Sequence, residues 1–248
     1  MDTHKLRENK FLSEKGLNEG SSIFFHIIKI KDNLLDMTHY VLRKILGPII
    51  SMIWIKKVTG LDNIPSTGGV ILAMNHQSYF DFLCLAAISP RNIHFLAAEK
   101  FFNHWLWKHL MKTTRQIRVD RRADDKSELH AVVHSHLDDR RVIGLFPEGT
   151  RSPHENDMLK AFTGVAQYGL FKKVPIVPVG IKGAFPVMSV HDKKPKFLKN
   201  IEIHIGEPIY FSEYHQRNDL THLDYKAVTH KVMQEISLLS GKRYSHEH

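Results

Sequence analysis

The sequence predicts an α/β domain with a mixed, largely parallel sheet flanked by helices, preceded by an N-terminal pair of amphipathic helices. From residue 61 onward, short aliphatic runs alternate with longer helical stretches, which is typical of strands joined by crossover helices. Before residue 47, apolar residues recur at helical spacing. A chain of 248 residues can bury a sizeable core. We therefore expect a polar start and amphipathic helices at 1–60, and the folded domain at 61–248.

The first sixty residues combine a polar start with an amphipathic segment. Residues 1–20 are polar and of mixed charge, so no secretory signal is expected. Apolar residues then keep a helical period until Gly47-Pro48, which is expected to break or kink the helix. The apolar stretch 45–55 is shorter than the ~20 residues that span a bilayer. Two interpretations stay open: the helical pair packs on the core, or it lies in the membrane interface as an anchor.

The remainder of the chain alternates between expected strands and expected helices. Strands are expected at 69–74, 92–97, 116–119, 141–146, 174–181 and 201–205. Helices are expected near 79–89, 101–112, 125–139 and 158–171, with a last one at about 222–239. In such a fold the catalytic side chains belong in loops at the carboxyl ends of strands.

The stretch MNHQSYFDFL at 74–83 places a histidine and an aspartate directly after the first of these strands. Residues five apart lie ~140° around a helix axis, so His76 and Asp81 cannot pair on one regular helix. With His76 in the loop and Asp81 in the first helical turn, the carboxylate could orient the imidazole as a general base. The alternative is that Asp81 only caps the helix that follows Ser78.

No enzyme nucleophile accompanies this histidine in the sequence. The chain has no Gly-x-Ser-x-Gly motif, and Cys84 lies deep in an apolar helical stretch. A base without a nucleophile on the enzyme indicates that the substrate supplies the reacting hydroxyl.

A second motif, FPEGTRS at 146–152, follows another expected strand. Gly149 allows a close backbone approach, Thr150 offers a hydroxyl, and Arg151 carries a planar fork suited to phosphate. Glu148 could orient Arg151 or a loop amide. An ordinary turn with a surface arginine is the alternative, which so specific a set of side chains disfavours.

Together, NHQSYFD and FPEGTRS, about 70 residues apart, resemble the glycerophospholipid acyltransferases, and most closely the 1-acylglycerol-3-phosphate (lysophosphatidate) acyltransferases. The resemblance runs from about Leu61 to Ile209 and implies that 61–248 is an acyltransferase domain. It implies that His76 is the general base and that Asp81 orients it. It also implies a set of residues that bind the acceptor phosphate: Glu148, Gly149, Thr150 and Arg151.

Two further blocks extend the resemblance, with departures from the family pattern. Lys100 and Arg121 match the ends of a third block and would add phosphate contacts, although the usual Pro and Gly between them are missing. VPIVPV at 174–179 matches a fourth block. Phe162 stands where many relatives carry a lysine. Either Lys160 replaces that contact or the contact is absent.

Composition agrees with a lipid-directed enzyme and argues against other classes. The net charge of +9 suits phosphorylated substrates at an anionic membrane. Nucleic-acid binding ranks last, because no helix-turn-helix or RNA-binding signature is present. The histidines of HAVVHSH at 130–136 are expected to form a solvated helix face, since no metal-ligand pattern supports them. A single cysteine indicates a reducing, cytosol-facing compartment.

The expected function is transfer of a fatty acyl group from acyl-CoA or acyl carrier protein to the free hydroxyl of lysophosphatidate, giving phosphatidic acid in phospholipid biosynthesis. No metal or organic cofactor is expected. The partners would be the lysophospholipid, the thioester donor and a membrane surface. Because the acceptor is a lipid, the amphipathic helices of residues 1–60 are expected to act as a membrane anchor, with the protein peripheral or monotopic on the cytoplasmic face. Two alternatives remain: another acceptor, such as glycerol 3-phosphate or another lysophospholipid, or a non-catalytic lipid-binding protein on the same fold.

Overall fold

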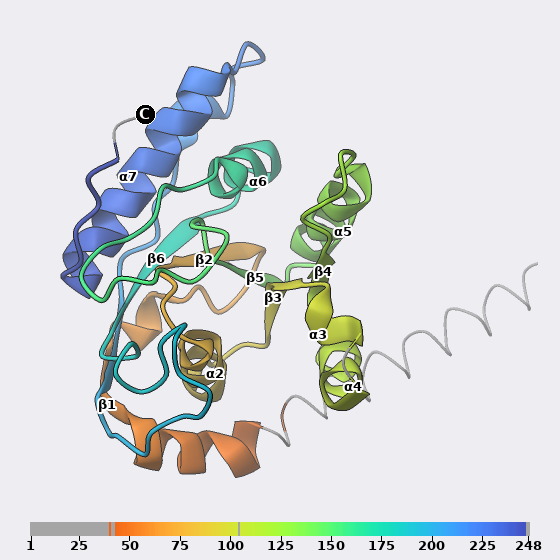
Figure 1. The fold of residues 1–248 in the computed structure, drawn as a ribbon. Coiled ribbons are helices and arrows are strands. Elements are labelled where there is room, and N and C mark those ends of the chain that lie inside the picture. The colour runs from red at the N-terminus through yellow and green to blue at the C-terminus, as the bar shows by residue number, and fades with distance from the viewer. Residues whose placement is uncertain (1–39, 41–42, 104, 247–248) are drawn as a thin grey trace, which may run out of the picture.

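The computed structural model describes residue 40, residues 43–103 and residues 105–246 (Figure 1). A seven-stranded sheet with the order β1-β7-β6-β2-β5-β3-β4 forms the centre. Neighbouring strands are parallel except for the pair β6 and β7. The strands are β1 (Ile55–Thr59), β2 (Val70–Met74), β3 (Ile93–Ala98), β4 (Ile117–Val119), β5 (Val142–Leu145), β6 (Ile176–Lys182) and β7 (Ile201–Ile205). The predicted α/β class with a largely parallel sheet is confirmed.

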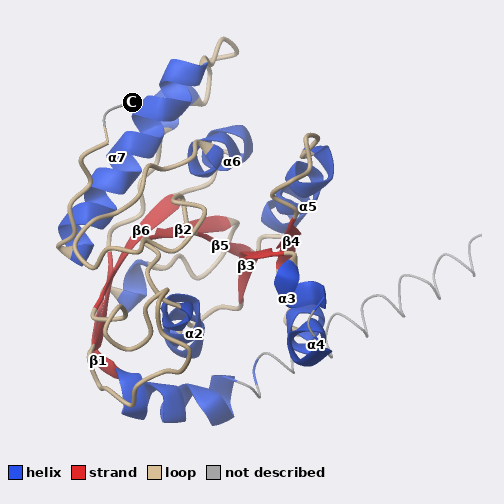
Figure 2. Ribbon diagram, in the orientation of Figure 1, coloured by secondary structure: helices blue, strands red, loops and turns tan. Residues whose placement is uncertain are grey.

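Helices cover both faces of this sheet (Figure 2). The helix at 43–54 and α2 (Tyr79–Ile88) pack on one face, in a cluster that includes Ile50 and Leu85. The other face carries α5 (Ser127–Asp138), α6 (Gly164–Lys172) and α7 (His222–Ser240). The expected helix near 101–112 consists of two pieces, α3 (Lys100–Asn103) and α4 (Trp105–Thr113). Short 3-10 helices cover Leu61–Asn63 and Ser212–Tyr214.

The central strand β2 explains why the first motif follows a continuous apolar run. All five of its residues are buried, because both faces of the sheet are covered. Ile71 and Ala73 belong to the cluster under α5, α6 and α7, whereas Leu72 and Met74 belong to the cluster under α2. The strand is fixed from both sides, so the loop that follows Met74 starts from a rigid position.

The edge strand β1 was not predicted from the sequence. Residues 55–59 continue an apolar helical stretch, and the run ends in two lysines that gave no strand signal. The strand forms because a distant segment, β7, offers a parallel partner, and Lys56 is 2.9 Å from Glu202 in an ion pair. Only Ile55 of the five β1 residues is buried. Tertiary pairing therefore overrides the local pattern here.

Gly47-Pro48 does not break the helix, so the predicted break was wrong. Residues 43–54 are continuously helical. Gly47 lies against the end of α2, where a Cβ atom would be 2.8 Å from the carbonyl oxygen of Ala87. The glycine thus permits a close approach of two helices. Most of the expected preceding helix at 21–46 lies outside the described residues.

The expected helix at 158–171 begins later than predicted, at Gly164. The backbone N–H of Leu159 donates to Glu148 Oε2 at 2.7 Å, and that of Phe162 donates to the carbonyl of Pro147 at 2.8 Å. These amide groups are therefore committed to the loop after β5. The segment before α6 becomes a partner of the second motif.

Candidate active site

The loop after β2 is fixed to the sheet immediately before His76. Asn75 is buried, and its side-chain amide donates to the carbonyl of Ile181 at 2.9 Å and accepts from the Ile181 N–H at 2.8 Å. Asn75 therefore connects the loop after β2 to strand β6 by two hydrogen bonds. These two hydrogen bonds fix the position of the backbone immediately before His76.

His76 and Asp81 form the pair that the sequence indicated. Nδ1 of His76 lies 2.9 Å from Oδ2 of Asp81, which is fully buried in the first turn of α2. The same oxygen accepts the backbone N–H groups of Gln77 and Ser78, both at 2.7 Å. Asp81 thus caps the helix and orients the imidazole together, so the two interpretations are not exclusive.

This arrangement presents the other ring nitrogen of His76. When Nδ1–H donates to the carboxylate, neutral imidazole keeps Nε2 as a proton acceptor. The ring stacks on Phe146 with centroids 3.8 Å apart, and 14% of the side chain is exposed. A rigid, oriented and partly accessible base is the result.

Glu148 holds the backbone of both loops. Its Oε1 accepts the N–H of His76 at 2.7 Å, and its Oε2 accepts the N–H of Leu159. The carboxyl group is buried, and this burial raises its pKa to about 7. Both oxygens are occupied by amides, and an ionised carboxylate repels phosphate. The expected phosphate contact of Glu148 stays a prediction, while its contacts here are with the His76 loop.

The second motif, FPEGTRS at 146–152, is hydrogen-bonded to the loop that carries His76. The backbone N–H of Ser152 donates to the carbonyl of His76 at 2.7 Å, so His76 is held by its N–H and its C=O. Gly149 has a φ of 68°, and a Cβ there would lie 2.8 Å from the ring of Phe162. Thr150 is exposed next to it. The positive φ therefore favours glycine at position 149, and the exposed Phe162 ring packs directly against it.

Tyr79 brings two of the predicted cations together. The guanidinium carbon of Arg151 lies 3.8 Å from the centroid of the Tyr79 ring, and Nζ of Lys100 lies 3.3 Å from the Tyr79 hydroxyl. Arg151 also donates to the carbonyl of Ser189 at 3.4 Å. Two positive charges thus lie beside the first turn of α2, which carries Asp81.

Arg121 stands apart from this group. It is exposed in the loop after β4, and β4 is three strands away from β2 in the sheet. At ~4.8 Å per strand, this places the two strand ends about 14 Å apart. Within the described part of the chain, Arg121 makes no hydrogen bond or ion pair with the other predicted site residues.

The histidines of α5 pack with aromatic side chains. The rings of His130 and His134 have centroids 6.4 Å apart, and both contact Tyr168. His134 also stacks on Phe171 at 4.4 Å. Among the described residues, no three histidine, cysteine or acidic side chains are grouped to hold a metal ion.

Comparison with known proteins agrees with this geometry. The sequence model of the Acyltransferase family matches residues 56–182, just over half of the chain and both motifs. A 1-acyl-sn-glycerol-3-phosphate acyltransferase of Bacillus subtilis is 30% identical over 192 residues, covering 75% of this chain and 88% of that protein. The chain belongs to the glycerophospholipid acyltransferase family. It is therefore an acyltransferase.

Two further similarities were found, one in sequence and one in fold. An enzyme of the same name from Helicobacter pylori is 33% identical over 88 residues, covering 34% of this chain and 36% of that one. The crystal structure of the 1-acyl-sn-glycerophosphate acyltransferase PlsC from Thermotoga maritima superposes with a TM-score of 0.63 at 19% identity. The superposition covers 88% of this chain and 99% of the Thermotoga maritima chain, and it shows that the two proteins share a fold.

Several residues that organise the acyltransferase site were not identified from the sequence. Asn75 and Gln77 flank His76 in the motif, but their side chains bind backbone groups of β6 and of the loop at 154–155. Tyr79 was also missed. Tyr79 directly follows the N-cap residue Ser78. Because side chains of a helix point towards its N-terminus, this position could have indicated that Tyr79 lies near the loop of His76.

Proposed function

We propose that this acyltransferase moves a fatty acyl group from acyl-CoA or acyl carrier protein to the free hydroxyl of lysophosphatidate, giving phosphatidic acid. The observation that carries the proposal is the buried Asp81 bound to Nδ1 of His76, beside Arg151 and Lys100. A base next to clustered cations suits an acceptor that has both a hydroxyl and a phosphate. The names of the relatives from Bacillus subtilis and Helicobacter pylori support the same acceptor.

The proposed reaction is a direct transfer. Nε2 of His76 takes the proton of the acceptor hydroxyl, and the oxygen attacks the thioester carbonyl. The tetrahedral intermediate collapses with cleavage of the C–S bond, and the imidazolium returns its proton to the departing thiolate. Asp81 stabilises the imidazolium while it exists. An acyl-cysteine is not part of the proposal, because Cys84 is buried and this burial raises the pKa of its thiol.

The acceptor phosphate is proposed to bind at the second motif. Arg151 supplies the planar fork, while Gly149 and Thr150 supply the backbone and hydroxyl of the loop. Lys100 adds a second charge through its place beside Tyr79. Arg121 extends this positive edge to the end of β4, at a greater distance from His76. No metal or organic cofactor takes part in the proposed reaction.

The direct test is release of free thiol from oleoyl-CoA in mixed micelles with different acceptors. We expect release that depends on lysophosphatidate and exceeds that with lysophosphatidylethanolamine or glycerol 3-phosphate. Acyl carrier protein loaded with the same chain tests the other donor. Faster release with a different acceptor would replace lysophosphatidate in the proposal. Absence of release with either donor and every acceptor would favour the non-catalytic lipid-binding alternative.

Arg151→Ala is expected to raise the KM for lysophosphatidate at least about tenfold, because a charged hydrogen bond contributes ~1.5–3 kcal/mol. The kcat should change less, since Arg151 contacts Tyr79 and Ser189 rather than His76. Initial rates at varied acceptor concentration measure both constants. Arg217→Ala, which removes an exposed arginine paired with Asp219 and Asp224, is the matched control. An unchanged KM in Arg151→Ala would contradict the phosphate contact.

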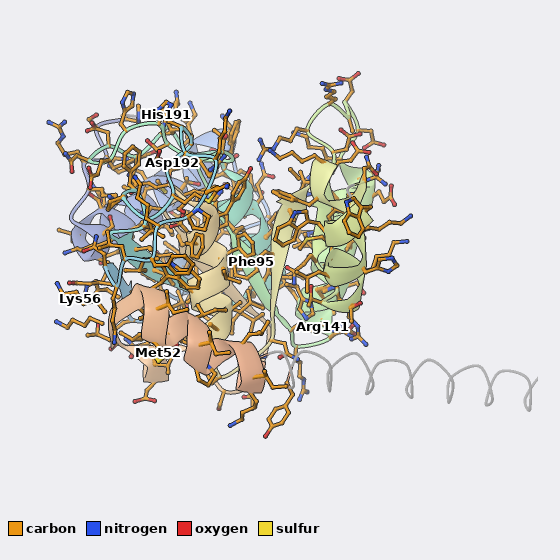
Figure 3. All side chains as sticks on the ribbon, turned by 60° about the horizontal axis from the view of Figure 1, so that its bottom comes forward. Met52, Lys56, Phe95, Arg141, His191 and Asp192 are labelled. Atoms are coloured by element: carbon orange, nitrogen blue, oxygen red, sulfur yellow. The ribbon has the colours of Figure 1, made fainter. Side chains whose placement is uncertain are left out.

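We also propose that the part of residues 1–60 that precedes β1 anchors the enzyme to the cytoplasmic face of a membrane, as a peripheral or monotopic protein. Among the described residues, no helix has both the length and the apolar character to cross a bilayer. The helix at 43–54 instead exposes one apolar side, formed by Ile45, Leu46, Ile49 and Met52. Met52, 67% exposed, lies at the outer side of this helix (Figure 3). Such a side suits burial at the lipid interface.

The double variant Ile49→Glu and Met52→Glu is expected to weaken binding to anionic phosphatidylglycerol vesicles at least about tenfold. Burial of each apolar side chain contributes ~1.5–3 kcal/mol, and the acids add repulsion from the lipid. Co-sedimentation with vesicles measures the binding. Leu238→Glu, which changes a still more exposed apolar residue on α7, should bind like the wild type. Equal binding of the double variant and the control would contradict this orientation.

A further inference from the structure

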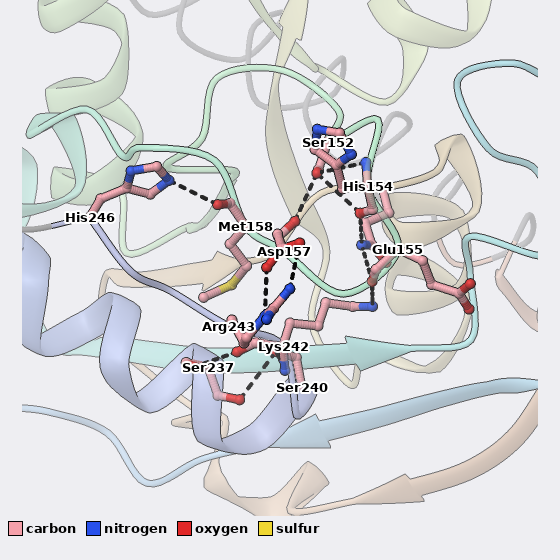
Figure 4. Close-up of polar contacts among 11 residues, drawn as sticks. Ser152, His154, Glu155, Asp157, Met158, Ser237, Ser240, Lys242, Arg243 and His246 are labelled. Carbon is pink, nitrogen blue, oxygen red and sulfur yellow. Dashed lines mark hydrogen bonds and ion pairs between the residues drawn. The ribbon is translucent and has the colours of Figure 1, made fainter.

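The C-terminal segment after α7 returns to the active-site loops (Figure 4). Gly241 ends α7 with a φ of 65° and turns the chain back. The next residues run beside the loop of residues 152–161: Arg243 N–H donates to the carbonyl of Asn156 at 2.8 Å, and Met158 N–H donates to that of Arg243 at 2.9 Å. Arg243 also forms a two-point ion pair with Asp157. The segment 241–246, here called the C-terminal strap, is thus hydrogen-bonded to this loop.

Lys242 is the buried member of the C-terminal strap. Only 7% of the residue is exposed, and its ammonium donates to the carbonyl oxygen of Glu155 at 2.5 Å. The side-chain amide of Gln77 donates to the same oxygen at 2.6 Å. Gln77 follows His76 directly in the chain. The carbonyl of Glu155 therefore connects the C-terminal strap to the motif that contains His76.

Three carboxylates act on Lys242, of which Asp81 and Glu148 are buried and Glu155 is exposed. Burial lowers the pKa of the Lys242 ammonium. Asp81, Glu155 and Glu148 act in the opposite direction by attracting its positive charge, while Lys182 repels it. Asp81 uses Oδ2 for three hydrogen bonds, but its Oδ1 is buried and has no hydrogen-bond partner among the described residues. A buried anion without a full set of donors needs a nearby cation.

We propose that Lys242 is a positioning residue of the acyl transfer, which ties the loop of residues 152–161 to the His76 motif and supplies the counter-charge for the buried carboxylates of Asp81 and Glu148. Lys242 does not touch the reacting atoms. It acts through Gln77, which borders His76, and through Glu148, which holds the N–H of His76. The kinetic part of this proposal rests on the proposed acyl transfer, whereas the counter-charge part does not.

Three substitutions of Lys242 separate the effect of its hydrogen bond to Glu155 from the effect of its positive charge. Lys242→Arg keeps the charge and a donor, Lys242→Gln keeps a donor without charge, and Lys242→Met keeps neither. Arg243→Met is the matched control, because it removes an exposed ion pair of the same strap and leaves the strap backbone in place. Thermal unfolding confirms that each variant is folded. If Lys242→Met does not fold, Lys242→Gln carries the test.

The first readout is the dependence of kcat on pH. We expect Lys242→Met and Lys242→Gln to lower kcat at least about tenfold with little change in the acceptor KM. Loss of a positive charge makes protonation of nearby groups easier, so the acidic limb of kcat should move up by about one pH unit. Lys242→Arg should retain most of the wild-type kcat and an acidic limb close to that of the wild type. An unmoved limb in the neutral variants, or an arginine variant as impaired as the methionine variant, would overturn the proposal.

The second readout needs no activity. Burial raises the pKa of Glu148 to about 7, so its carboxyl group is largely ionised at pH 8.5 and largely protonated at pH 5.5. The loss of Tm in Lys242→Met should therefore be larger at pH 8.5, whereas Arg243→Met should lose the same amount at both. Equal losses in Lys242→Met at the two pH values would refute the counter-charge. An inactive wild type that retains this pH dependence would refute only the proposed function.

Discussion

His76→Ala is expected to lower acceptor-dependent thiol release by at least about 10³-fold at saturating substrates, since a positioned general base contributes up to ~10⁴-fold. The acceptor hydroxyl has to lose its proton for the attack on the thioester. Nε2 of His76 is the ring nitrogen left available for this step, because Nδ1 is bound to Asp81. The KM for lysophosphatidate should change little, because the proposed phosphate contacts are those of Arg151 and Lys100.

The variant should remain folded. His76 makes its main structural contacts through its backbone, which donates to Glu148 and accepts from Ser152, and alanine retains both. His222→Ala, which removes an exposed histidine at the start of α7, should keep wild-type activity. If the folded His76→Ala enzyme retains a tenth or more of the wild-type kcat, His76 is not the base.

The sequence was most informative where local pattern and burial agree. Six strands and the order of helices between them followed from apolar runs, since strands such as β2 are buried on both faces and leave few alternatives. The edge strand β1 was missed, because it depends on pairing with β7. The continuous helix through Gly47-Pro48 was missed, because the glycine serves a contact with Ala87 that only the tertiary structure contains.

The candidate site shows the same division. The pairing of His76 with Asp81 was predictable, because both lie in one short stretch and the geometry of a loop and a first helical turn limits their distance. Glu148 was expected to orient a loop amide or Arg151 and to bind phosphate, and it holds two backbone amides. The relevant partner, Leu159, is eleven residues away in a segment expected to be helical. Lys242 is more than 160 residues from His76, and no local pattern relates them.

Asp81→Asn is expected to lower kcat by about 10²–10⁴-fold while the protein stays folded, by analogy with the orienting aspartate of a serine-protease triad. The amide has no charge to stabilise the imidazolium that forms during the transfer. Its NH₂ group can also donate to Nδ1 of His76, which would place the ring proton on Nε2 and remove the acceptor that faces the substrate. Rates at saturating acceptor measure this loss.

The helix-capping role of Asp81 has to be separated from its role toward His76, because one oxygen atom serves both. Ser78→Ala makes that separation. It removes the cap hydroxyl, which accepts the N–H of Phe80 at 3.1 Å, and should cost ~1 kcal/mol of stability with kcat within about threefold of wild type. If Ser78→Ala loses as much kcat as Asp81→Asn at a similar Tm, Asp81 matters only for the helix. A large loss confined to Asp81→Asn assigns the effect to the orientation and charge of the His76 ring.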